Sequence, residues 1–359
     1  MKKCLIIVLA VLMSLTACTN RTPIWILPPG VLYPDNEPAP EPCKHLELEA
    51  TDWFDDGQHY PSAGKCKSCG ESVTRTSIEI GTAEELATLG EDLSKFYDIG
   101  CYTISIIDDI DMSTEKEWPY INLDGSKVPY NKKDFVVNGN GHSIKNLSTG
   151  DTTTTQNSGF IANIWSAVTL EINNLTLIEA TVTADSGSSN GVGGFIGYMQ
   201  ATESVKLNNC HVIDSTISGG HWTGGIYGYG AGYSGKDGPV FTNILIEGCS
   251  VEGTNISSIN ASTGGIMGHA GGDKDTAITV ENTKVIDCEI TSTGNKEGDI
   301  KAGNILGTNG IGDTVLKNVT FENNDVTSDD TVVTEAYGRL EFGTNNDGSL
   351  TIDDVKISG

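Results

Sequence analysis

The chain has 359 residues, a formal net charge of −26 and an isoelectric point of about 4.4. A surface this acidic repels nucleic acid and anionic lipid headgroups, so the composition excludes a nucleic-acid-binding function. The 43 glycines and an aromatic content of only 7% favour many short strands joined by turns over long helices.

The first 18 residues have the pattern of a secretory signal. Lys2 and Lys3 precede an apolar run, Leu5 to Leu15, that is too short to span a bilayer. The next residues, Thr16-Ala17-Cys18, complete a segment that resembles the lipobox of bacterial lipoproteins. The resemblance implies removal of residues 1–17 and lipidation of Cys18; the alternative is an ordinary signal peptide with an incidental cysteine. The two residues directly after Cys18 are Thr19 and Asn20, so the acidic signal that retains some bacterial lipoproteins in the inner membrane is absent. We therefore expect a lipid-anchored protein of the bacterial cell envelope, at the outer membrane or cell surface.

Two short segments come after the signal. Residues 18–42 hold seven of the eleven prolines and are predicted to form an extended tether. Residues 43–75 contain a Cys-x-x-Cys-Gly turn that is typical of a zinc knuckle, because two thiolates flanking a turn can bind one metal ion. A structural zinc site would take four ligands: Cys43, His45, Cys66 and Cys69. Disulfide pairing in an oxidising compartment is the alternative that the sequence leaves open.

Residues 76–137 are predicted to hold one helix and the N-terminal cap of a β-helix formed by residues 138–359. Thr82 and Glu85 form a capping box, in which each side chain can bond to the backbone of the other. Leu86, Leu89 and Leu93 then mark one apolar helix face. A strand is expected over residues 101–110.

A short phrase recurs through residues 138–359: an aliphatic residue, any residue, usually Asn, then a small or medium apolar residue. Its copies end at Leu147, Leu175, Cys210, Cys249, Thr283, Val319 and Val355. The steps between these ends are 28, 35, 39, 34, 36 and 36 residues, which indicates a repeat architecture whose units must stack.

The repeats predict a parallel β-helix of about six to seven coils, with three short strands per unit. Equivalent residues of successive coils should then stack on one another. We expect one internal aliphatic stack: Ile144, Ile172, Leu207, Ile246, Val280, Leu316 and Ile352. We also expect an Asn ladder at a corner, since Asn tolerates left-handed backbone: Asn146, Asn174, Asn209, Asn282 and Asn318. Outward loops are expected at residues 185–192, 231–238 and 295–301.

Residues 78–359 resemble the bacterial surface proteins with GLUG-type repeats. The resemblance rests on Asp109-Ile110-Asp111, on Asn138-Gly139-Asn140-Gly141-His142 and on the Gly-Gly-apolar-apolar-Gly segments of the repeats. It implies a right-handed β-helix of the kind found in adhesin-like proteins, and a structural turn at Asp109 and Asp111. Ala162 departs from the pattern, because it stands where the first unit should have its closing glycine.

The search for catalytic groups gives no convincing set. Asp108, Asp109 and Asp111 precede the repeats. Asp214, Asp287 and Asp325 are interpreted as solvent-exposed surface residues without a catalytic role. Only three arginines occur, and no general base has an evident partner. Cys210 and Cys249 fall at a core position, and Cys288 falls off the repeat register as an isolated thiol. We therefore expect a protein that is not an enzyme.

Aromatic residues give a better case for binding. After the Gly-Gly-apolar-apolar-Gly segments the repeats place rings that could hold sugars, although the same rings could simply cover glycine-rich strands. The candidate ligand-binding residues are Tyr198, Trp222, Tyr227, Tyr229, Tyr233 and His269. The loops at residues 273–275 and 328–330 are candidates for weak calcium binding, although their spacing matches no recognised loop.

We therefore expect a non-catalytic, lipid-anchored envelope protein that serves adhesion or ligand display. Its partners would be the membrane, through the anchor, and a glycan or a protein of the host or cell surface. The alternative function is a glycan-binding or glycan-cleaving β-helix.

Overall fold

The computed structural model describes most of the chain after residue 46. The described residues are 47–53, 60–95, 103–115, 117–124, 134–149, 157–165, 169–185, 191–200, 204–219, 221–231, 234–235, 238–239, 242–259, 262–271, 276–294, 301–303, 305–309, 312–329, 331–332, 337–340 and 349–358. The predicted signal, lipid site and tether lie outside them, as do Cys43, His45, Tyr233 and residues 273–275. Among the described residues, no helix has the length and apolarity needed to cross a membrane.

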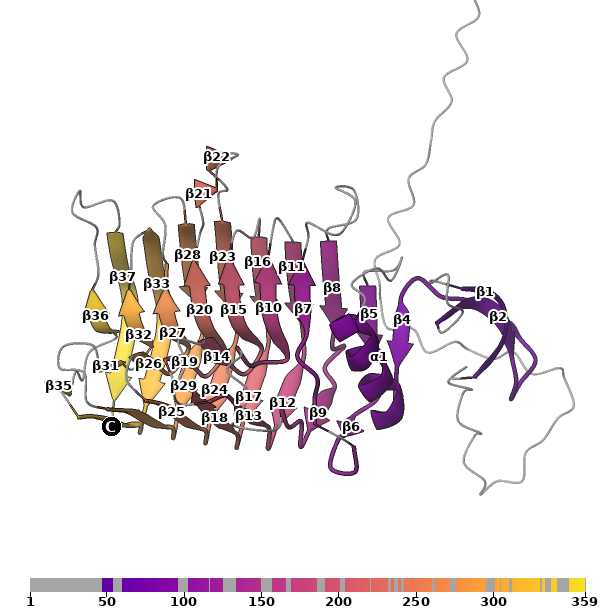
Figure 1. The fold of residues 1–359 in the computed structure, drawn as a ribbon, viewed down its shortest axis with the longest axis horizontal. Coiled ribbons are helices and arrows are strands. Elements are labelled where there is room, and N and C mark those ends of the chain that lie inside the picture. Colours follow the sequence, from indigo (N-terminus) through magenta and orange to yellow (C-terminus); the bar gives the residue numbers. More distant parts are fainter. Residues whose placement is uncertain are drawn as a thin grey trace, which may run out of the picture. The chain divides into compact units, whose positions relative to one another are not determined.

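The protein is an all-β parallel β-solenoid, as the repeats predict (Figure 1). Five complete coils are seen in the described part, with incomplete coils at both ends. Four of these coils contribute five strands each to four sheets, and the fifth contributes four because β33 runs through both arms of one sheet, so the prediction of three strands per unit was too low. The strands that sequence reasoning missed include the glycine-rich ones, which lack an apolar period.

The longest sheet has fifteen strands arranged in two arms. The first arm consists of β4 (Ile78–Ile80), β5 (Thr103–Ile106), β8 (Asp134–Asn138), β11 (Thr169–Asn173), β16 (Ser204–Asn208), β23 (Thr242–Glu247), β28 (Thr276–Glu281), β33 (Asp313–Glu322) and β37 (Ser349–Ser358). The second arm consists of β6 (Ile110–Asp111), β9 (Ser143–Lys145), β12 (Thr176–Ile178), β17 (His211–Ile213), β24 (Ser250–Glu252) and β29 (Lys284–Ile286). The residues of β33 and β37 continue through both arms.

Three further parallel sheets close each coil. The seven-stranded sheet consists of β7 (Asn122–Asp124), β10 (Ile161–Trp165), β15 (Ile196–Gln200), β20 (Tyr227–Ala231), β27 (Met267–Ala270), β32 (Leu306–Asn309) and β36 (Tyr337–Leu340). The first five-stranded sheet consists of β13 (Thr181–Thr183), β18 (Thr216–Gly219), β25 (Asn255–Ile259), β30 (Glu289–Thr293) and β34 (Asp325–Ser328). The glycine-rich sheet consists of β14 (Gly191–Gly193), β19 (Trp222–Gly224), β26 (Ser262–Gly264), β31 (Lys301–Gly303) and β35 (Thr331–Val332).

Two small antiparallel sheets lie outside the coils. One consists of β1 (Leu48–Trp53), β2 (Pro61–Cys66) and β3 (Ser72–Thr74), and the other of β21 (Ser234–Gly235) and β22 (Gly238–Pro239). The second pair falls in the predicted outward loop over residues 231–238.

The first corner, between the two arms of the longest sheet, carries the predicted ladder. One residue per coil has left-handed backbone there, with φ between 49° and 64°: Asn174, Asn209, Gly248, Asn282, Asn318 and Asp354. Asn209 Nδ2 donates to Asn174 Oδ1 at 2.9 Å, and Asn318 Nδ2 donates to Asn282 Oδ1 at 2.7 Å. The Asn ladder is therefore confirmed from the second copy of the phrase onward.

The placement of the first copy of the phrase was wrong by one corner. Ile144 pairs with Leu177, whereas Ile172 pairs with Val137 and, on its other side, Leu207. Asn146 accordingly belongs to the second corner, with φ 57° and its backbone amide bonded to the Ile178 carbonyl. The first step of 28 residues, shorter than all the others, is the sequence signal of this shift.

The second corner lies five residues after the first. Its left-handed residues, with φ between 50° and 57°, are Asn146, Glu179, Asp214, Gly253, Asp287 and Asn323. The residue that comes after each of them forms a second ladder, in which the Ala180 amide donates to Ser215 Oγ at 3.0 Å and the Cys288 amide donates to Asn324 Oδ1 at 2.7 Å. Cys288 is thus in register, so the prediction that it falls off the repeat was wrong. Asp214 and Asp287 are exposed, as predicted, and their left-handed backbone also forms a turn.

The glycine-rich sheet packs directly on the seven-stranded sheet. A Cβ added at Gly264 would lie 2.1 Å from the Met267 carbonyl oxygen and 2.5 Å from the Gly307 amide nitrogen. A Cβ at Gly224 would meet the Tyr227 carbonyl oxygen at 2.2 Å. The repeated glycines are therefore required by backbone-to-backbone contact between two sheets.

The helix α1 (Ala83–Lys95) covers the N-terminal end of the core. Its capping box forms as predicted, since the Glu85 amide donates to Thr82 Oγ1 at 3.2 Å and the Thr82 amide donates to Glu85 Oε2 at 3.1 Å. Leu86, Leu89 and Leu93 are buried. At the other end of the core, Ile352 continues the aliphatic stack but is 48% exposed.

Candidate functional site

A line of aromatic side chains runs from coil to coil along the seven-stranded sheet. Tyr198 of β15 pairs in register with Tyr229 of β20, which pairs with His269 of β27. Trp165 of β10 adjoins Tyr198, with ring centroids 5.6 Å apart. We call these four residues, with Trp222 of β19, the aromatic stripe. Sequence reasoning found all of them except Trp165, which stands two residues after the aligned position and reaches Tyr198 diagonally.

Within the stripe most rings lie against one another. The Tyr198 and Tyr229 rings are stacked at 4.9 Å with planes 13° apart, and Tyr229 meets His269 at 4.8 Å and 34°. Stacking covers the faces of these rings, so they present edges and polar atoms outward. Tyr198 and Tyr229 are half-buried, while His269 is almost fully buried.

Trp222 lies across the stripe instead of continuing it. It comes from the glycine-rich sheet, and its centroid is 4.3 Å from that of Tyr229 with planes 38° apart. His221 meets it edge-on at 4.3 Å and 89°, and His269 at 5.8 Å and 71°. Trp222 is half-buried, so part of its indole is accessible to solvent. Because the indole lies across the row, it is the member of the stripe best oriented to present ring surface to a ligand.

The prediction that Tyr227 lies on the binding surface was wrong. Tyr227 is fully buried and pairs with Ile196 and Met267, which are core residues. Its ring occupies space left by Gly230, since a Cβ there would lie 2.8 Å from the Tyr227 hydroxyl. Burial raises the pKa of Tyr227 well above its ordinary value. Tyr233, the other predicted residue of this group, lies outside the described residues.

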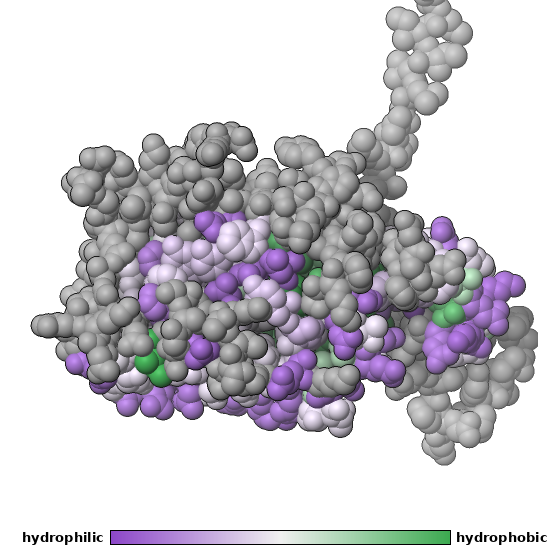
Figure 2. Space-filling view, viewed as in Figure 1, coloured by the Kyte–Doolittle hydropathy of each residue, from purple (hydrophilic) through white to green (hydrophobic). Residues whose placement is uncertain are grey.

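Figure 2 shows pale and hydrophilic residues over most of the described surface in this view, with hydrophobic residues in small separate spots. Burial raises the pKa of Tyr198, so its hydroxyl stays protonated at neutral pH. Tyr198 Oη lies 3.4 Å from Gln200 Oε1, its polar neighbour on the same strand. The stripe therefore combines ring surface with hydrogen-bonding groups.

The buried cysteines of the corners are core residues, as predicted for two of them. Cys210 and Cys249 occupy neighbouring coils, and the Cys210 amide donates to Cys249 Sγ at 3.4 Å. Cys249 Sγ in turn donates to the Leu207 and Glu247 carbonyls at 3.4 and 3.3 Å. The hydrogen bond with Cys249 and burial raise the pKa of Cys210, the bond with Cys210 lowers the pKa of Cys249, and burial raises the pKa of Cys288 to about 11. Cys210 and Cys288 are therefore protonated at neutral pH, which makes them poor nucleophiles.

The acidic residues considered for catalysis are engaged in turns. Asp109 Oδ1 accepts from the Ser143 amide at 2.8 Å, and this bond holds the pKa of Asp109 below its ordinary value. Asp111 Oδ1 accepts from Asn146 Nδ2 at 2.8 Å, which lowers the pKa of Asp111. Asp329, in a loop considered for calcium, accepts from the Gly294 amide at 3.0 Å. In the described part of the chain, no three His, Cys, Asp or Glu side chains are grouped to hold a metal ion.

Half of the predicted zinc site can be placed. Cys66 ends β2 and Cys69 comes next in a tight turn, closed by the Gly70 amide donating to the Cys66 carbonyl at 2.8 Å with Gly70 at φ 77°. Cys66 is buried and Cys69 is exposed. Because Cys43 and His45 lie outside the described residues, zinc and disulfide both stay predictions. Metal analysis with thiol titration of the full chain would decide between them.

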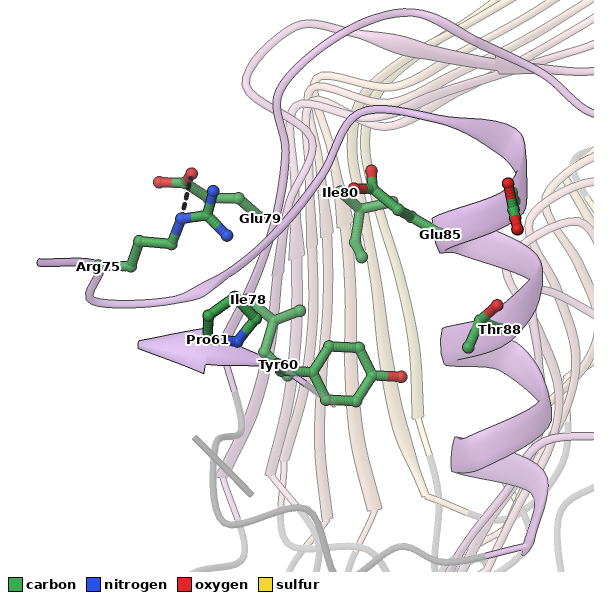
Figure 3. A pocket seen from close by; sticks show the side chains of 9 residues that line it. Tyr60, Pro61, Arg75, Ile78, Glu79, Ile80, Glu85 and Thr88 are labelled. Carbon is green, nitrogen blue, oxygen red and sulfur yellow. Dashed lines mark ion pairs between the residues drawn. The ribbon is translucent and has the colours of Figure 1, made fainter. Parts of the chain in front are cut away.

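A pocket of about 240 Å³ lies between β2, β4 and α1 (Figure 3). The Tyr60 ring, Ile78 and Ile80 face the helix, while Arg75 turns to Glu79, with Nε 3.0 Å from Oε2. Tyr60 Oη donates to Asp92 Oδ2 at 2.7 Å, and Glu85 is used in the helix cap. Arg75 and Glu79 pair with each other, Glu85 bonds to backbone amides, and no residue of the aromatic stripe lines this pocket, so we call it the packed seam and do not assign it to the site.

Comparisons with known proteins add little to this description. No protein-family model and no curated protein matches the chain. Among solved structures, the chain is similar to a putative immunoglobulin A1 protease from Bacteroides ovatus. The identity is 18%, the match covers 74% of this chain and 84% of that chain, and the TM-score is 0.42. The resemblance to GLUG-type repeat proteins stays a prediction, whereas the parallel solenoid that it implies is observed.

Proposed function

We propose that the protein is a non-catalytic binding protein of the cell envelope that holds a glycan on the aromatic stripe. The observation that carries the proposal is the crossed arrangement of Trp222 over the stacked Tyr198, Tyr229 and His269 rings. An indole set across a row of rings offers an apolar surface for the C–H groups of a sugar. Ring edges and the Tyr198 hydroxyl beside it offer hydrogen bonds to sugar hydroxyls.

The geometry of the solenoid supports a chain-like ligand. Successive coils are one strand spacing apart, about 4.8 Å, which is close to the length of one pyranose unit. The stripe repeats at this spacing from β10 to β27. A polysaccharide lying along the axis would therefore meet one ring per sugar. The predicted lipid anchor and tether would display this face away from the membrane.

The test is a glycan array probed with the full chain, followed by the Trp222→Ala variant. We expect binding to at least one class of polysaccharide, lost by tenfold or more in the variant. Trp53→Ala is the matched control, because Trp53 is also half-buried but lies in β1, outside the coils. Full binding by Trp222→Ala, or a blank array with capture of a protein ligand instead, would refute the glycan proposal.

The non-catalytic part is tested separately. Incubation of the bound glycan with wild-type protein, followed by a reducing-end assay, should release no new chain ends. Cleavage would favour the alternative of a glycan-degrading enzyme.

A further inference from the structure

A second, polar pocket lies where the stripe reaches the N-terminal coils. Its volume is about 220 Å³, enough for a single sugar ring. The pocket is lined by Glu117, Trp118, Pro119, Tyr120, Thr149, Asn157, Ser158, Gly159, Ala162 and Thr183. It is separate from the packed seam beside Tyr60, with which it shares no lining residue.

Asn163 connects this pocket to the stripe. On one side it pairs in register with Tyr198, so it occupies the stripe position one coil before that ring. On the other side its side chain bonds to two pocket residues: Asn163 Nδ2 donates to the Tyr120 hydroxyl, and Asn157 Nδ2 donates to Asn163 Oδ1 at 2.7 Å. The pocket is therefore at the end of the row of stripe positions, one residue away through Ala162.

The walls of the pocket are fixed by bonds that do not involve a ligand. Trp118 Nε1 donates to the Phe160 carbonyl at 2.9 Å, and its ring stacks on Phe160 at 5.2 Å and 8°. Asn157 Oδ1 accepts from the Gly191 amide at 2.7 Å, and Ser158 Oγ donates to Thr149 Oγ1 at 2.7 Å. A site with a rigid wall loses less entropy on binding than a mobile one.

The lining has the chemistry of a site for a neutral sugar. Trp118 and Pro119 give an apolar wall. The Tyr120 hydroxyl, which accepts from Asn163, can still donate, and Ser158 Oγ, which donates to Thr149, can still accept. Burial raises the pKa of Tyr120, which keeps its hydroxyl protonated at neutral pH. Among the described residues that line the pocket, Glu117 is the one charged residue. Its carboxylate would repel a uronic or sialic acid, so the described lining favours an uncharged sugar.

We infer that this pocket is a terminal subsite that receives the end sugar of a neutral glycan whose next units lie along the aromatic stripe. The inference rests on the proposed function. From β10 to β27 the stripe spans three strand spacings, about 14 Å. One terminal sugar and three or four stripe positions then account for the bound length. Affinity should rise with chain length to about four or five units and then level off.

The test uses four neutral linear hexasaccharides as probes: those of β-1,4-glucose, β-1,4-xylose, β-1,4-mannose and β-1,4-N-acetylglucosamine. Calorimetry with the full chain should find binding to at least one of them. End recognition predicts that the soluble polymer of the same sugar binds at least tenfold more weakly per unit mass, because it carries fewer ends. Equal or tighter binding of the polymer per unit mass would overturn the terminal subsite.

Variants at the pocket separate the two proposals. Glu117 is exposed, so Glu117→Trp should fill the pocket without unfolding the chain and weaken binding by tenfold or more. Glu117→Gln, the matched control, should change affinity less than twofold. Tyr120→Phe gives an independent reading, and we expect a severalfold loss. Wild-type affinity in Glu117→Trp and Tyr120→Phe, with binding still lost in Trp222→Ala, would overturn the subsite and leave the proposed function standing. No binding of any hexasaccharide to wild type would overturn both.

Discussion

The first corner and the aromatic stripe differ in what is repeated from coil to coil: residue type at the corner, and backbone contact along the stripe. At the first corner the residue type itself repeats, as in Asn174, Asn209, Asn282 and Asn318, because left-handed backbone and a bond to the next coil are needed each time. Along the stripe the backbone contact repeats through the closing glycines, while the residue at the aligned position changes: Asn163, Tyr198, Tyr229, His269 and Thr308.

The difference separates residues kept for the fold from residues open to function. A corner side chain is dictated by φ and by its neighbours in the stack, so its variation is limited to Asn, Asp, Gly and similar residues. The aligned position on the seven-stranded sheet has no such backbone requirement, because none of its residues has left-handed backbone. Its aromatic character over three consecutive coils is therefore a feature that the fold does not demand.

The largest effect should come from the contact between the glycine-rich and seven-stranded sheets. Gly264→Ala would place a Cβ 2.1 Å from the Met267 carbonyl oxygen, against backbone that cannot move independently. We expect a loss of at least about 3 kcal/mol in the free energy of unfolding, at or beyond the upper range of overpacking. Urea denaturation followed by circular dichroism measures it.

Gly248→Asn is the matched control for that glycine. Gly248 has φ 64° and no atom within 3.4 Å of an added Cβ, and other coils have Asn at this corner position. We expect stability within about 0.5 kcal/mol of wild type, because a gained amide contact offsets the strain of a non-glycine residue. If Gly248→Asn lost more stability than Gly264→Ala, the corner glycine would be the more constrained of the two, contrary to this expectation.

The next effect is expected at the Asn ladder. Asn209→Leu puts a branched apolar residue at φ 51° and removes the bond to Asn174, so we expect a loss of about 2 kcal/mol. Asn209→Gly keeps the backbone conformation and removes only the bond, and should cost about 1 kcal/mol or less. Chemical denaturation of both variants separates backbone strain from the side-chain bond. If Asn209→Leu is neutral, the ladder has no role in stability.

A smaller effect is expected for the buried thiols. In the next coil, Thr283 takes the position of Cys249, and its Oγ1 donates to the Glu281 carbonyl at 2.9 Å as Cys249 Sγ does to Glu247. Cys249→Thr should therefore change the free energy of unfolding by about 1 kcal/mol or less. Calorimetric melting of the variant checks this. Cys249→Leu serves as the contrast, because it enlarges the side chain without the bond.

Sequence reasoning succeeded where one residue type answers one structural need. The capping box at Thr82 and Glu85 and the Asn ladder are of this kind. It failed at the second corner, where Glu179, Asp214, Gly253, Asp287 and Asn323 all adopt the same left-handed conformation. Four residue types fill this corner and none of them recurs in every coil, so no single residue type marks it.

The candidate site shows the same limit at finer scale. Tyr227 and Tyr229 are two residues apart, so a regular strand would put them on one face. The pairing of β15 with β20 skips Gly197 and Gly228, whose backbones approach the glycine-rich sheet, and the alternation shifts at this point. Tyr227 therefore points into the core and Tyr229 onto the stripe. Trp222 could be predicted as a candidate because it is an aromatic residue close to the aligned positions. Its crossed orientation could not be predicted, because it depends on β19, a strand without an apolar pattern.

The smallest effect should come from His211 at the first corner, and it depends on pH. His211 Nδ1 lies 2.8 Å from Ser250 Oγ and Nε2 lies 3.2 Å from Asn209 Oδ1. Burial lowers the pKa of His211 below its ordinary value of 6.5, while Glu252 opposes this shift. Below pH 6.5 the unfolded chain therefore binds a proton at His211 more readily than the folded chain does. The contribution of His211 to the free energy of unfolding is complete above pH 6.5 and is lost as the pH falls. We expect the urea midpoint of wild type to drop more between pH 7 and pH 5.5 than that of His211→Gln, which cannot titrate. Equal drops would mean that the corner tolerates a charged imidazole, and that its hydrogen bonds form equally well in either state.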